Sequence, residues 1–227
     1  LLTGEAPVNF TAAGEPMLGT ASREVDYQGA EVLASDADHP FLRICLDDVI
    51  IETNLVGSYN ADNVMAAIAV GKQFGVSFEE AVAAISAYVP SNKRSQMTKT
   101  ERNTLIVDAY NANPTSMAAA LENFSNVSAA SKVALLGDML ELGEESMSEH
   151  VAVIRSACSR GLSMVCFVGK EFQKASSEMP ADQLENARFF ATSDELAAWL
   201  NENPLSGTVV LIKGSRGTRM ENVIPSL

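Results

Sequence analysis

The sequence has few cysteines, no long apolar run and no leader-like start, and each absence excludes a class of protein. Its three cysteines, Cys45, Cys158 and Cys166, show none of the spacings that bind zinc or indicate a disulfide framework, which predicts free, buried thiols in a reducing compartment. No apolar stretch reaches the length of a membrane span, and the first residues carry no signal-peptide pattern. We therefore expect a cytoplasmic protein.

Basic residues are also scarce. Lys and Arg number 16 against 29 Asp and Glu, which gives a net charge of −13. A surface of this charge repels phosphate backbones and anionic lipid, so we expect neither nucleic acid nor membrane as a partner. The rest of the composition, 47% hydrophobic and 20% charged over 227 residues, is typical of a soluble globular protein with one large or two small domains. The chain begins with Leu1 rather than Met, which favours a segment of a longer protein.

The residue pattern changes near Pro90, which predicts two unlike modules, residues 1–90 and 91–227. Apolar runs broken by turn residues predict short antiparallel strands in the first module, at 30–34, 41–46 and 49–52. Two helices are predicted after them, at 60–74 and 77–88. Ser77 is the expected N-cap of the second helix. Both helices are rich in apolar residues, so neither is expected on the surface.

The second module alternates between strands and helices up to the last residues. Strands are predicted at 104–108, 132–136, 164–168, 188–191 and 208–213. Helices are predicted after them, at 114–127, 144–160, 171–178, 193–202 and 219–223. Repeated βα units of this length predict an α/β fold with a Rossmann-like, doubly wound and mostly parallel sheet. Such sheets bind their ligands at the carboxyl ends of the strands.

The first of these strands runs into the segment Asp-Ala-Tyr-Asn-Ala-Asn-Pro at 108–114. A carboxylate that leaves a strand here, Asp108, can accept hydrogen bonds from ribose hydroxyls. Pro114 at the first helical position opens a helix whose free N–H groups favour an anion. Alternatively, Asp108 and Asn113 only cap the turn and the helix. The residues alone leave both interpretations open.

Two further strands end in charged motifs. The strand at 132–136 is followed by Gly-Asp-Met-Leu-Glu-Leu-Gly, in which Asp138 and Glu141 could hold an ammonium group or share a cation through water. Alternatively, they merely form an acidic cap for the next helix. The strand at 208–213 is followed by Gly-Ser-Arg-Gly, so that Lys213 and Arg216 lie at one strand end. Two cations repel each other there without an anion, which favours a site for a carboxylate or phosphate.

The first module contributes one more candidate group. Asn60 and Asn63 lie one helical turn apart, so their carboxamides could face the same ligand, and a carboxamide matches the donor and acceptor of adenine N6 and N7. Asn is equally common as a helix cap. Arg94, between the modules, is a lone arginine that would ordinarily be solvated.

Taken in order, five segments resemble the Mur ligases. They are Gly-x-x-Asn-x-x-Asn-x-x-Ala-Ala at 57–67, Arg-Ser-Gln at 94–96, Asp-Ala-Tyr-Asn-Ala-Asn-Pro at 108–114, Leu-Gly-Asp-Met-x-Glu-Leu-Gly at 136–143 with His150 following, and Lys-Gly-Ser-Arg at 213–216. The third and fourth are similar to the branch of the family that adds D-alanyl-D-alanine to the precursor UDP-N-acetylmuramoyl-tripeptide. The resemblance is dense from Gly57 to the end of the chain.

The resemblance implies a three-domain enzyme of which this chain holds the tail of the central ATPase domain, residues 1–90, and the whole carboxy-terminal domain, residues 91–227. A Walker A loop, Gly-x-x-x-x-Gly-Lys-Ser/Thr, is absent from the sequence. The family's modified lysine and its magnesium-binding residues are not found either, so we expect no metal site in this chain. ATP and Mg²⁺ are expected as cofactors of the full-length enzyme, and the chain alone is expected to be inactive.

The resemblance also assigns roles to the candidate residues. It implies that Asn60 and Asn63 face adenine, that Asp108 faces ribose, and that Arg94 is the catalytic residue at the phosphates of ATP. The incoming dipeptide is expected near a larger set of side chains, namely Asn111, Asn113, Asp138, Glu141, Lys213, Ser215 and Arg216.

Two other interpretations compete with this one. The chain could be a non-catalytic, flavodoxin-like binding module, which would form an independent protein with its own initiating Met. It could also come from a ligase of the folylpolyglutamate-synthase type, which would need other sequences at 108–114 and 136–143. Both fit the observed residues poorly.

Overall fold

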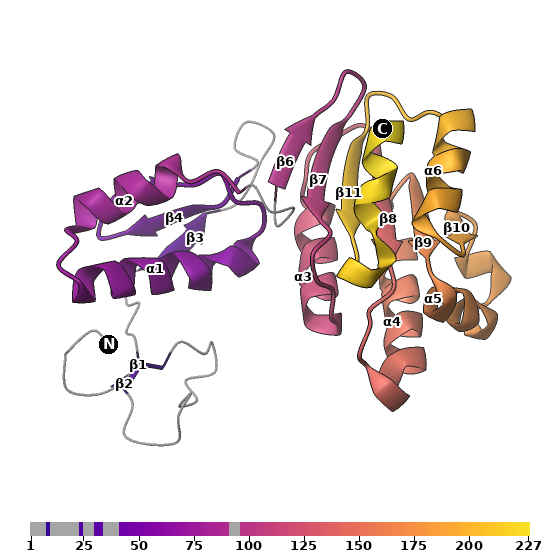
Figure 1. Cartoon of the computed structure of the whole chain (residues 1–227), viewed down its shortest axis with the longest axis horizontal. Helices are drawn as coiled ribbons and strands as arrows, with labels where there is room; N and C mark the ends of the chain where they lie inside the picture. Colours follow the sequence, from indigo (N-terminus) through magenta and orange to yellow (C-terminus); the bar gives the residue numbers. More distant parts are fainter. Residues whose placement is uncertain (1–7, 10–22, 25–29, 34–40, 91–95) are drawn as a thin grey trace. The chain divides into compact units, whose positions relative to one another are not determined.

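The computed structural model describes residues 8–9, 23–24, 30–33, 41–90 and 96–227, and the chain forms two compact units, 1–89 and 90–227 (Figure 1). The boundary lies one residue from the boundary expected from the sequence. Each unit has its own sheet and core, so each is described separately. Among the described residues, no helix is both long and apolar enough to cross a bilayer.

The first unit contains a three-stranded antiparallel sheet and two helices. Strands β3 (Glu31–Leu33), β4 (Arg43–Leu46) and β5 (Val49–Glu52) pair in that order. The antiparallel strands predicted here are confirmed. Asp47 and Asp48, both at positive φ, form the two-residue turn between β4 and β5, the conformation that matches hairpin twist. A further parallel pair joins β1 (Val8–Asn9) and β2 (Arg23–Glu24).

A 3₁₀ turn, η1 (Ser58–Asn60), leads into α1 (Ala61–Gln73) and α2 (Phe78–Ala87). Ser77 caps α2 as predicted, since its side chain accepts the N–H of Glu80 and its own N–H donates to the Glu80 carboxylate. The expectation that neither helix lies on the surface is wrong. Both helices contribute residues to the core of this unit, but other apolar side chains on them are exposed, among them Val70 of α1 at 44%.

The second unit confirms the predicted α/β fold with a doubly wound, mostly parallel sheet. Its strands are β6 (Gln96–Lys99), β7 (Thr104–Asp108), β8 (Lys132–Gly137), β9 (Met164–Val168), β10 (Ala187–Phe190) and β11 (Val209–Lys213). Their order in the sheet is β10-β9-β8-β11-β7-β6, and only β6 runs antiparallel to its neighbour. β6 was not predicted, since three of its four residues are polar; it is an edge strand, which needs no apolar pattern.

The helices of this unit are α3 (Pro114–Ser125), α4 (Ser146–Cys158), α5 (Lys170–Ala175) and α6 (Ser193–Glu202). The 3₁₀ turns are η2 (Gly143–Glu145), η3 (Ser176–Glu178), η4 (Ala181–Gln183), η5 (Arg216–Thr218) and η6 (Met220–Ser226). Two predicted helices are therefore shorter than expected: the helix at 144–160 starts with η2, and the helix at 171–178 ends with η3. The last predicted helix, at 219–223, is a 3₁₀ helix.

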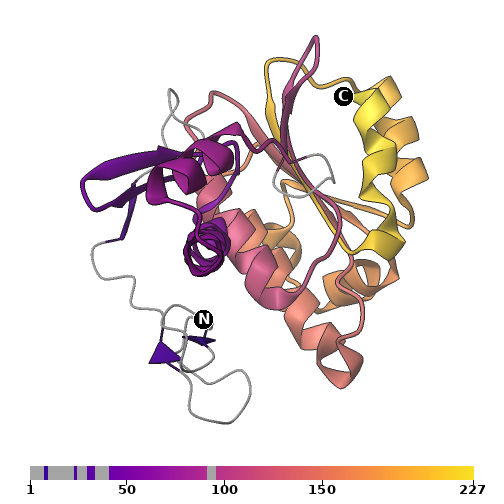
Figure 2. The ribbon, with the colours of Figure 1, turned by 60° about the vertical axis from the view of Figure 1, so that its left-hand side comes forward.

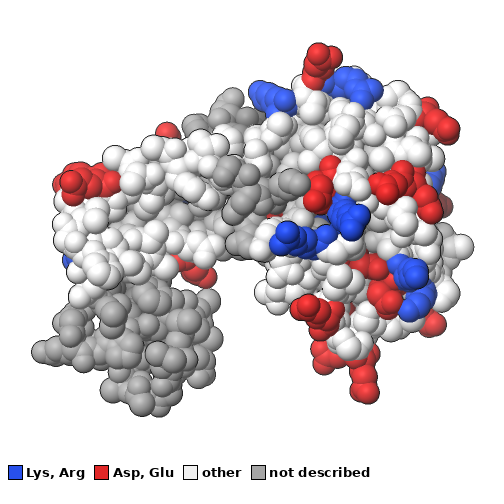
Figure 3. Space-filling model, in the orientation of Figure 1, with Lys and Arg blue, Asp and Glu red and all other residues white. Residues whose placement is uncertain are grey.

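Helices α3, α4 and α5 lie on one face of this sheet, whereas α6 and η6 lie on the other (Figures 1 and 2). Alternate strand residues divide between the two faces. Leu105, Val107 and Ile212, for example, join the core formed with α6 and η6. On the face shown in Figure 3, acidic and basic side chains of this unit are intermixed, and no single basic patch covers it.

Candidate substrate-binding site at the ends of three strands

Three strand ends meet at one edge of the six-stranded sheet. β7, β11 and β8 are neighbours, and Lys213 of β11 pairs in register with Asp108 of β7 and with Leu136 of β8. Because all three strands are parallel, the segments that follow them emerge at the same edge. These segments carry the motifs at 108–114, 136–143 and 213–216. The fold therefore brings the three motifs together.

Lys213 and Asp108 form a buried ion pair at this edge. Nζ of Lys213 lies 2.6 Å from Oδ2 of Asp108, and the exposed fractions of the two side chains are 1% and 12%. Nζ also donates to the carbonyl of Asn111 at 3.3 Å. A buried ammonium group is stable only with such partners. The expectation that Lys213 needs an anion from a ligand is therefore wrong, because Asp108 supplies one from a distant part of the chain. The role of Arg216 stays a prediction.

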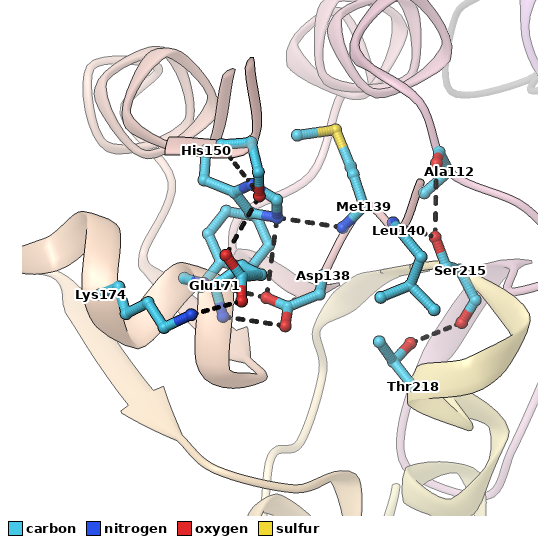
Figure 4. Close-up of polar contacts among 11 residues, drawn as sticks. Ala112, Asp138, Met139, Leu140, His150, Glu171, Lys174, Ser215 and Thr218 are labelled. Atoms are coloured by element: carbon cyan, nitrogen blue, oxygen red, sulfur yellow. Dashed lines mark hydrogen bonds and ion pairs between the residues drawn. The ribbon is translucent and has the colours of Figure 1, made fainter. Parts of the chain in front are cut away.

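Ser215 connects the three segments (Figure 4). Its Oγ accepts the N–H of Leu140 at 3.0 Å and donates to the carbonyl of Ala112 at 3.3 Å. Its own N–H donates to the carbonyl of Asp138 at 3.2 Å, and Thr218 Oγ1 donates to the Ser215 carbonyl at 2.6 Å. Ser215 is 5% exposed. Its hydroxyl therefore connects the loops that follow β7 and β8 and does not face solvent.

Close backbone packing supports the same arrangement. A Cβ atom at Gly214 would lie 2.7 Å from Thr218 Oγ1 and 3.0 Å from the Cα of Gly137. Any larger residue at Gly214 would push the β8 and β11 loops apart. The glycine of the Lys-Gly-Ser-Arg motif is thus required by the approach of two backbones.

Asp138 caps α5. Its Oδ2 accepts the N–H of Glu171 at 3.0 Å, and its Oδ1 accepts the N–H of Phe172 at 2.9 Å. Burial raises the pKa of Asp138, whereas the two backbone hydrogen bonds act in the opposite direction. A Cβ atom at Gly169, where φ is 122°, would overlap the Asp138 carboxylate. Asp138 is therefore a cap, as one interpretation of the sequence allowed, but for α5 and not for the helix that follows it in the chain.

The more accessible candidates surround this buried framework. Tyr110 is 39% exposed, and the guanidinium carbon of Arg216, itself exposed, lies 5.7 Å from the centre of the Tyr110 ring, within range of a cation–π interaction. Asn111 is exposed as well. Glu141 is exposed and has a φ of 68°, which is rare for a residue other than glycine. Tyr110 belongs to the motif at 108–114, but the residue pattern alone indicated no role for it.

Asn113 is an N-cap, as the simpler interpretation held. Its Oδ1 accepts the N–H of Ser116 at 2.8 Å, and Pro114 is the first residue of α3. His150 also has a structural environment that was not predicted, since it is completely buried on α4. Its position on the inward face with Val153, Ile154 and Ala157 is the signal that could have indicated a buried, hydrogen-bonded histidine.

The candidate adenine site lies in the first unit. Asn60 is buried, and its Nδ2 donates to the carbonyl of Val56 at 2.9 Å. Asn63 is exposed, and its Nδ2 donates to Oδ1 of Asn60 at 3.2 Å. The two carboxamides therefore lie against each other, and their contact with adenine stays a prediction. Arg94 lies outside the described residues.

Comparison with known proteins identifies the family. A family model described as "Mur ligase, glutamate ligase domain" matches residues 93–216. The UDP-N-acetylmuramoyl-tripeptide--D-alanyl-D-alanine ligase of Treponema pallidum (strain Nichols) is 36% identical over 181 residues, which cover 78% of this chain and 39% of that protein. A crystal structure of MurF from Acinetobacter baumannii superposes with a TM-score of 0.75 at 27% identity, covering 87% of this chain and 44% of that one.

The MurF ligase from Thermotoga maritima, in complex with ADP, superposes with a TM-score of 0.63 and covers 88% of this chain and 43% of its own. At 20% identity this likeness shows the fold alone. The chain spans less than half of the length of each of these relatives. The family model covers more than half of this chain and includes all three motifs at the strand ends. The chain belongs to the Mur ligase family.

Proposed function

We propose that this chain is the carboxy-terminal part of an ATP-dependent ligase that joins D-alanyl-D-alanine to UDP-N-acetylmuramoyl-tripeptide. The observation that carries the proposal is the convergence of three motifs at one sheet edge, where Lys213, Asp108 and Ser215 hold them together. Open α/β sheets bind their ligands at such an edge. The similarity to the Treponema protein of that name supports the choice of substrates.

In the proposed reaction, ATP phosphorylates the terminal carboxylate of the tripeptide. The amine of the dipeptide then attacks the acyl phosphate, an amide bond forms, and phosphate leaves; ADP is the other product. Catalysis of this kind depends mainly on positioning and on stabilising charge as it moves. Because ATP is a cytoplasmic metabolite, the proposal also implies a cytoplasmic enzyme.

The burial of the candidate residues separates those that hold the loops of the dipeptide site from those that contact the ligand. Lys213, Asp138 and Ser215 are buried and bonded within the protein, so we assign them to holding the loops in place. Arg216 and Glu141 are exposed, so we assign them to the ligand. The guanidinium fork of Arg216 suits the dipeptide carboxylate, and the Glu141 carboxylate suits its ammonium group. Asn111 is an exposed neighbour, and Asn113 fixes the start of α3.

For ATP, we assign Asn60 and Asn63 to adenine, Asp108 to ribose and Arg94 to the phosphates. No described segment fits a phosphate-binding loop. Gly169 and Lys170 stand at the start of α5, but the carboxylate of Asp138 already occupies the N-terminus of that helix. A phosphate would be repelled there. We therefore assign phosphate and Mg²⁺ binding to other parts of the full-length enzyme, and we expect this chain alone to have no ligase or ATPase activity.

Release of ADP by the purified full-length enzyme tests the proposal. Release should require ATP, Mg²⁺, the tripeptide precursor and D-alanyl-D-alanine together, and the 227-residue chain alone should release none. A folate substrate with L-glutamate serves as the control for a folylpolyglutamate-type ligase. Activity with that pair and not with the dipeptide would overturn the proposal. ATP turnover by the 227-residue chain, abolished by Asp108→Ala, would overturn the assignment of phosphate binding elsewhere.

A further inference from the structure

His150 is completely buried, and both nitrogens of its ring have partners (Figure 4). Nε2 lies 3.1 Å from the backbone nitrogen of Met139 and accepts its N–H. Nδ1 lies 2.7 Å from the carbonyl oxygen of Ser146, an acceptor, so Nδ1 carries the ring proton. The ring edge also contacts Phe172 with centroids 4.6 Å apart. These partners define one form of the ring, neutral and protonated on Nδ1.

The bond from Met139 to His150 fixes the loop that follows β8. Met139 and Leu140 are consecutive residues whose N–H groups bind different partners, His150 in one case and Ser215 in the other. Ser215 in turn holds the carbonyl of Ala112 and precedes Arg216. Hydrogen bonds therefore hold the loop to α4 through Met139 and to the strand-end site through Leu140. Because these two N–H groups are consecutive, a displacement of the His150 ring would move Met139 and, through the next peptide group, the hydrogen bond to Ser215.

The surroundings of His150 make its hydrogen bond to the Met139 N–H sensitive to protonation of the ring. Oδ1 of Asp138, on the same loop, lies 3.7 Å from Nε2 and accepts the N–H of Phe172. Glu171 on α5 accepts a hydrogen bond from Ser146 Oγ at 3.1 Å and pairs with Lys174 at 2.8 Å. A proton on Nε2 would turn this atom from an acceptor into a donor. It could then no longer accept the N–H of Met139, and its nearest acceptor would be the carboxylate that caps α5.

We infer that His150 is a positioning residue for dipeptide binding, which in its neutral form holds the loop after β8 at the strand-end site and releases it on protonation. His150 itself touches no substrate in this account. It acts through Met139 and Leu140 on the segment that contains Glu141 and on the loop of Arg216. The identity of the ligand rests on the proposed function, whereas the hold of His150 on the loop does not.

Two substitutions in the full-length enzyme separate the effect of the Nε2 acceptor from the effect of its protonation. His150→Gln places a non-titrating amide oxygen near the position of Nε2, whereas His150→Leu removes the acceptor and keeps an apolar side chain. KM for D-alanyl-D-alanine and for ATP is measured from about pH 6 to pH 9, the range in which histidines change charge. Met147→Gln, at an exposed position on the same helix, is the matched control.

In the unmodified enzyme, KM for the dipeptide should rise as the pH falls, while KM for ATP changes little. His150→Gln should keep a low KM for the dipeptide and flatten this pH dependence. His150→Leu should raise KM for the dipeptide by about ten- to a hundred-fold at every pH, since small displacements in a binding site have effects of that size. An unchanged KM for the dipeptide in His150→Leu, or an equal rise for both substrates, would overturn the inference.

A measurement without substrate tests the hydrogen bond between His150 and the loop after β8 directly. The chain has two histidines, so the nitrogen NMR spectrum of the His150→Gln variant assigns the His150 ring by subtraction. The unmodified 227-residue chain should show Nδ1 protonated and Nε2 bare at about pH 8. The exchange of the Met139 amide, measured relative to the rate of an unstructured amide at the same pH, should be strongly slowed at that pH and less so on acidification. A proton on Nε2 at that pH would refute the inference. If instead the full-length enzyme does not use the dipeptide, the proposed function fails and this NMR result still decides the role of His150.

Discussion

The buried pair of Lys213 and Asp108 predicts a stability change that can be measured in the second unit. Lys213→Met keeps the apolar stem of the side chain and removes the charge. The carboxylate of Asp108, 12% exposed as a side chain, then loses the ammonium group 2.6 Å away. Asp108→Asn is the reciprocal change, which leaves the Lys213 ammonium group almost wholly buried beside a neutral amide.

The expected cost follows from the burial of the pair. Removing one partner of a buried ion pair typically costs about 3–5 kcal/mol, because the other charge stays desolvated without compensation. Since Asp108 keeps some solvent exposure, we expect the lower end, about 3 kcal/mol, for Lys213→Met. The double variant, Lys213→Met with Asp108→Asn, has no charge left at the position of this pair. It should be less destabilised than the sum of the single changes by about 1–3 kcal/mol.

Urea unfolding followed by tryptophan fluorescence measures these free energies. The only tryptophan, Trp199, packs on the core of the second unit with its ring 5.7 Å from that of Phe190, so its signal reports on this unit. The slope of the unfolding free energy against urea should stay the same in all variants. Strictly additive single changes, or a loss of less than about 1 kcal/mol in Lys213→Met, would show that the pair is not the buried, coupled contact described here.

Three further predictions concern other parts of the molecule. Arg216→Ala in the full-length enzyme should raise KM for D-alanyl-D-alanine about ten-fold or more and leave KM for ATP nearly unchanged, because the dipeptide carboxylate loses a bidentate partner; equal effects in steady-state kinetics would place this arginine elsewhere. Gly169→Ala should lower the unfolding free energy by about 2 kcal/mol or more, because the new methyl group meets the Asp138 carboxylate, whereas Gly161→Ala, with open space around it, should cost about 1 kcal/mol in the same urea experiment. In hydrogen exchange by mass spectrometry, β3, β4 and β5, which contain mostly exposed or half-buried residues, should be less protected than β7, in which four of five residues are buried. Equal protection would contradict our view of the first unit as part of a larger domain.

Much of the second unit could be predicted from the sequence because its central strands are buried on both faces. Runs such as 133–136 and 164–168 are entirely apolar, and such runs are typical of parallel sheets. Helix starts were equally clear where a cap and a proline coincide, as at Asn113 and Pro114. β6 was missed because an edge strand needs no apolar pattern, and its four residues are mostly polar.

The candidate site was predicted only in part, because the partners of its residues come from distant segments. Nothing in the sequence near Lys213 indicates that its counter-ion is Asp108, since the register of β11 against β7 creates that contact. Asp138 caps a helix 33 residues further along, so its role depends on the packing of α5 against the end of β8. Sequence patterns locate strand ends and helix caps. They do not show which charged side chains already have a partner within the fold.

The mass of the product formed by the full-length enzyme tests the central claim most directly. The enzyme is supplied with ATP, Mg²⁺, UDP-N-acetylmuramoyl-tripeptide and an equimolar mixture of D-alanyl-D-alanine, D-alanine and L-glutamate. The proposed function predicts one product, whose mass equals that of the precursor plus D-alanyl-D-alanine minus one water. A product that carries D-alanine or L-glutamate in place of the dipeptide, or no product while ATP is hydrolysed, would contradict it.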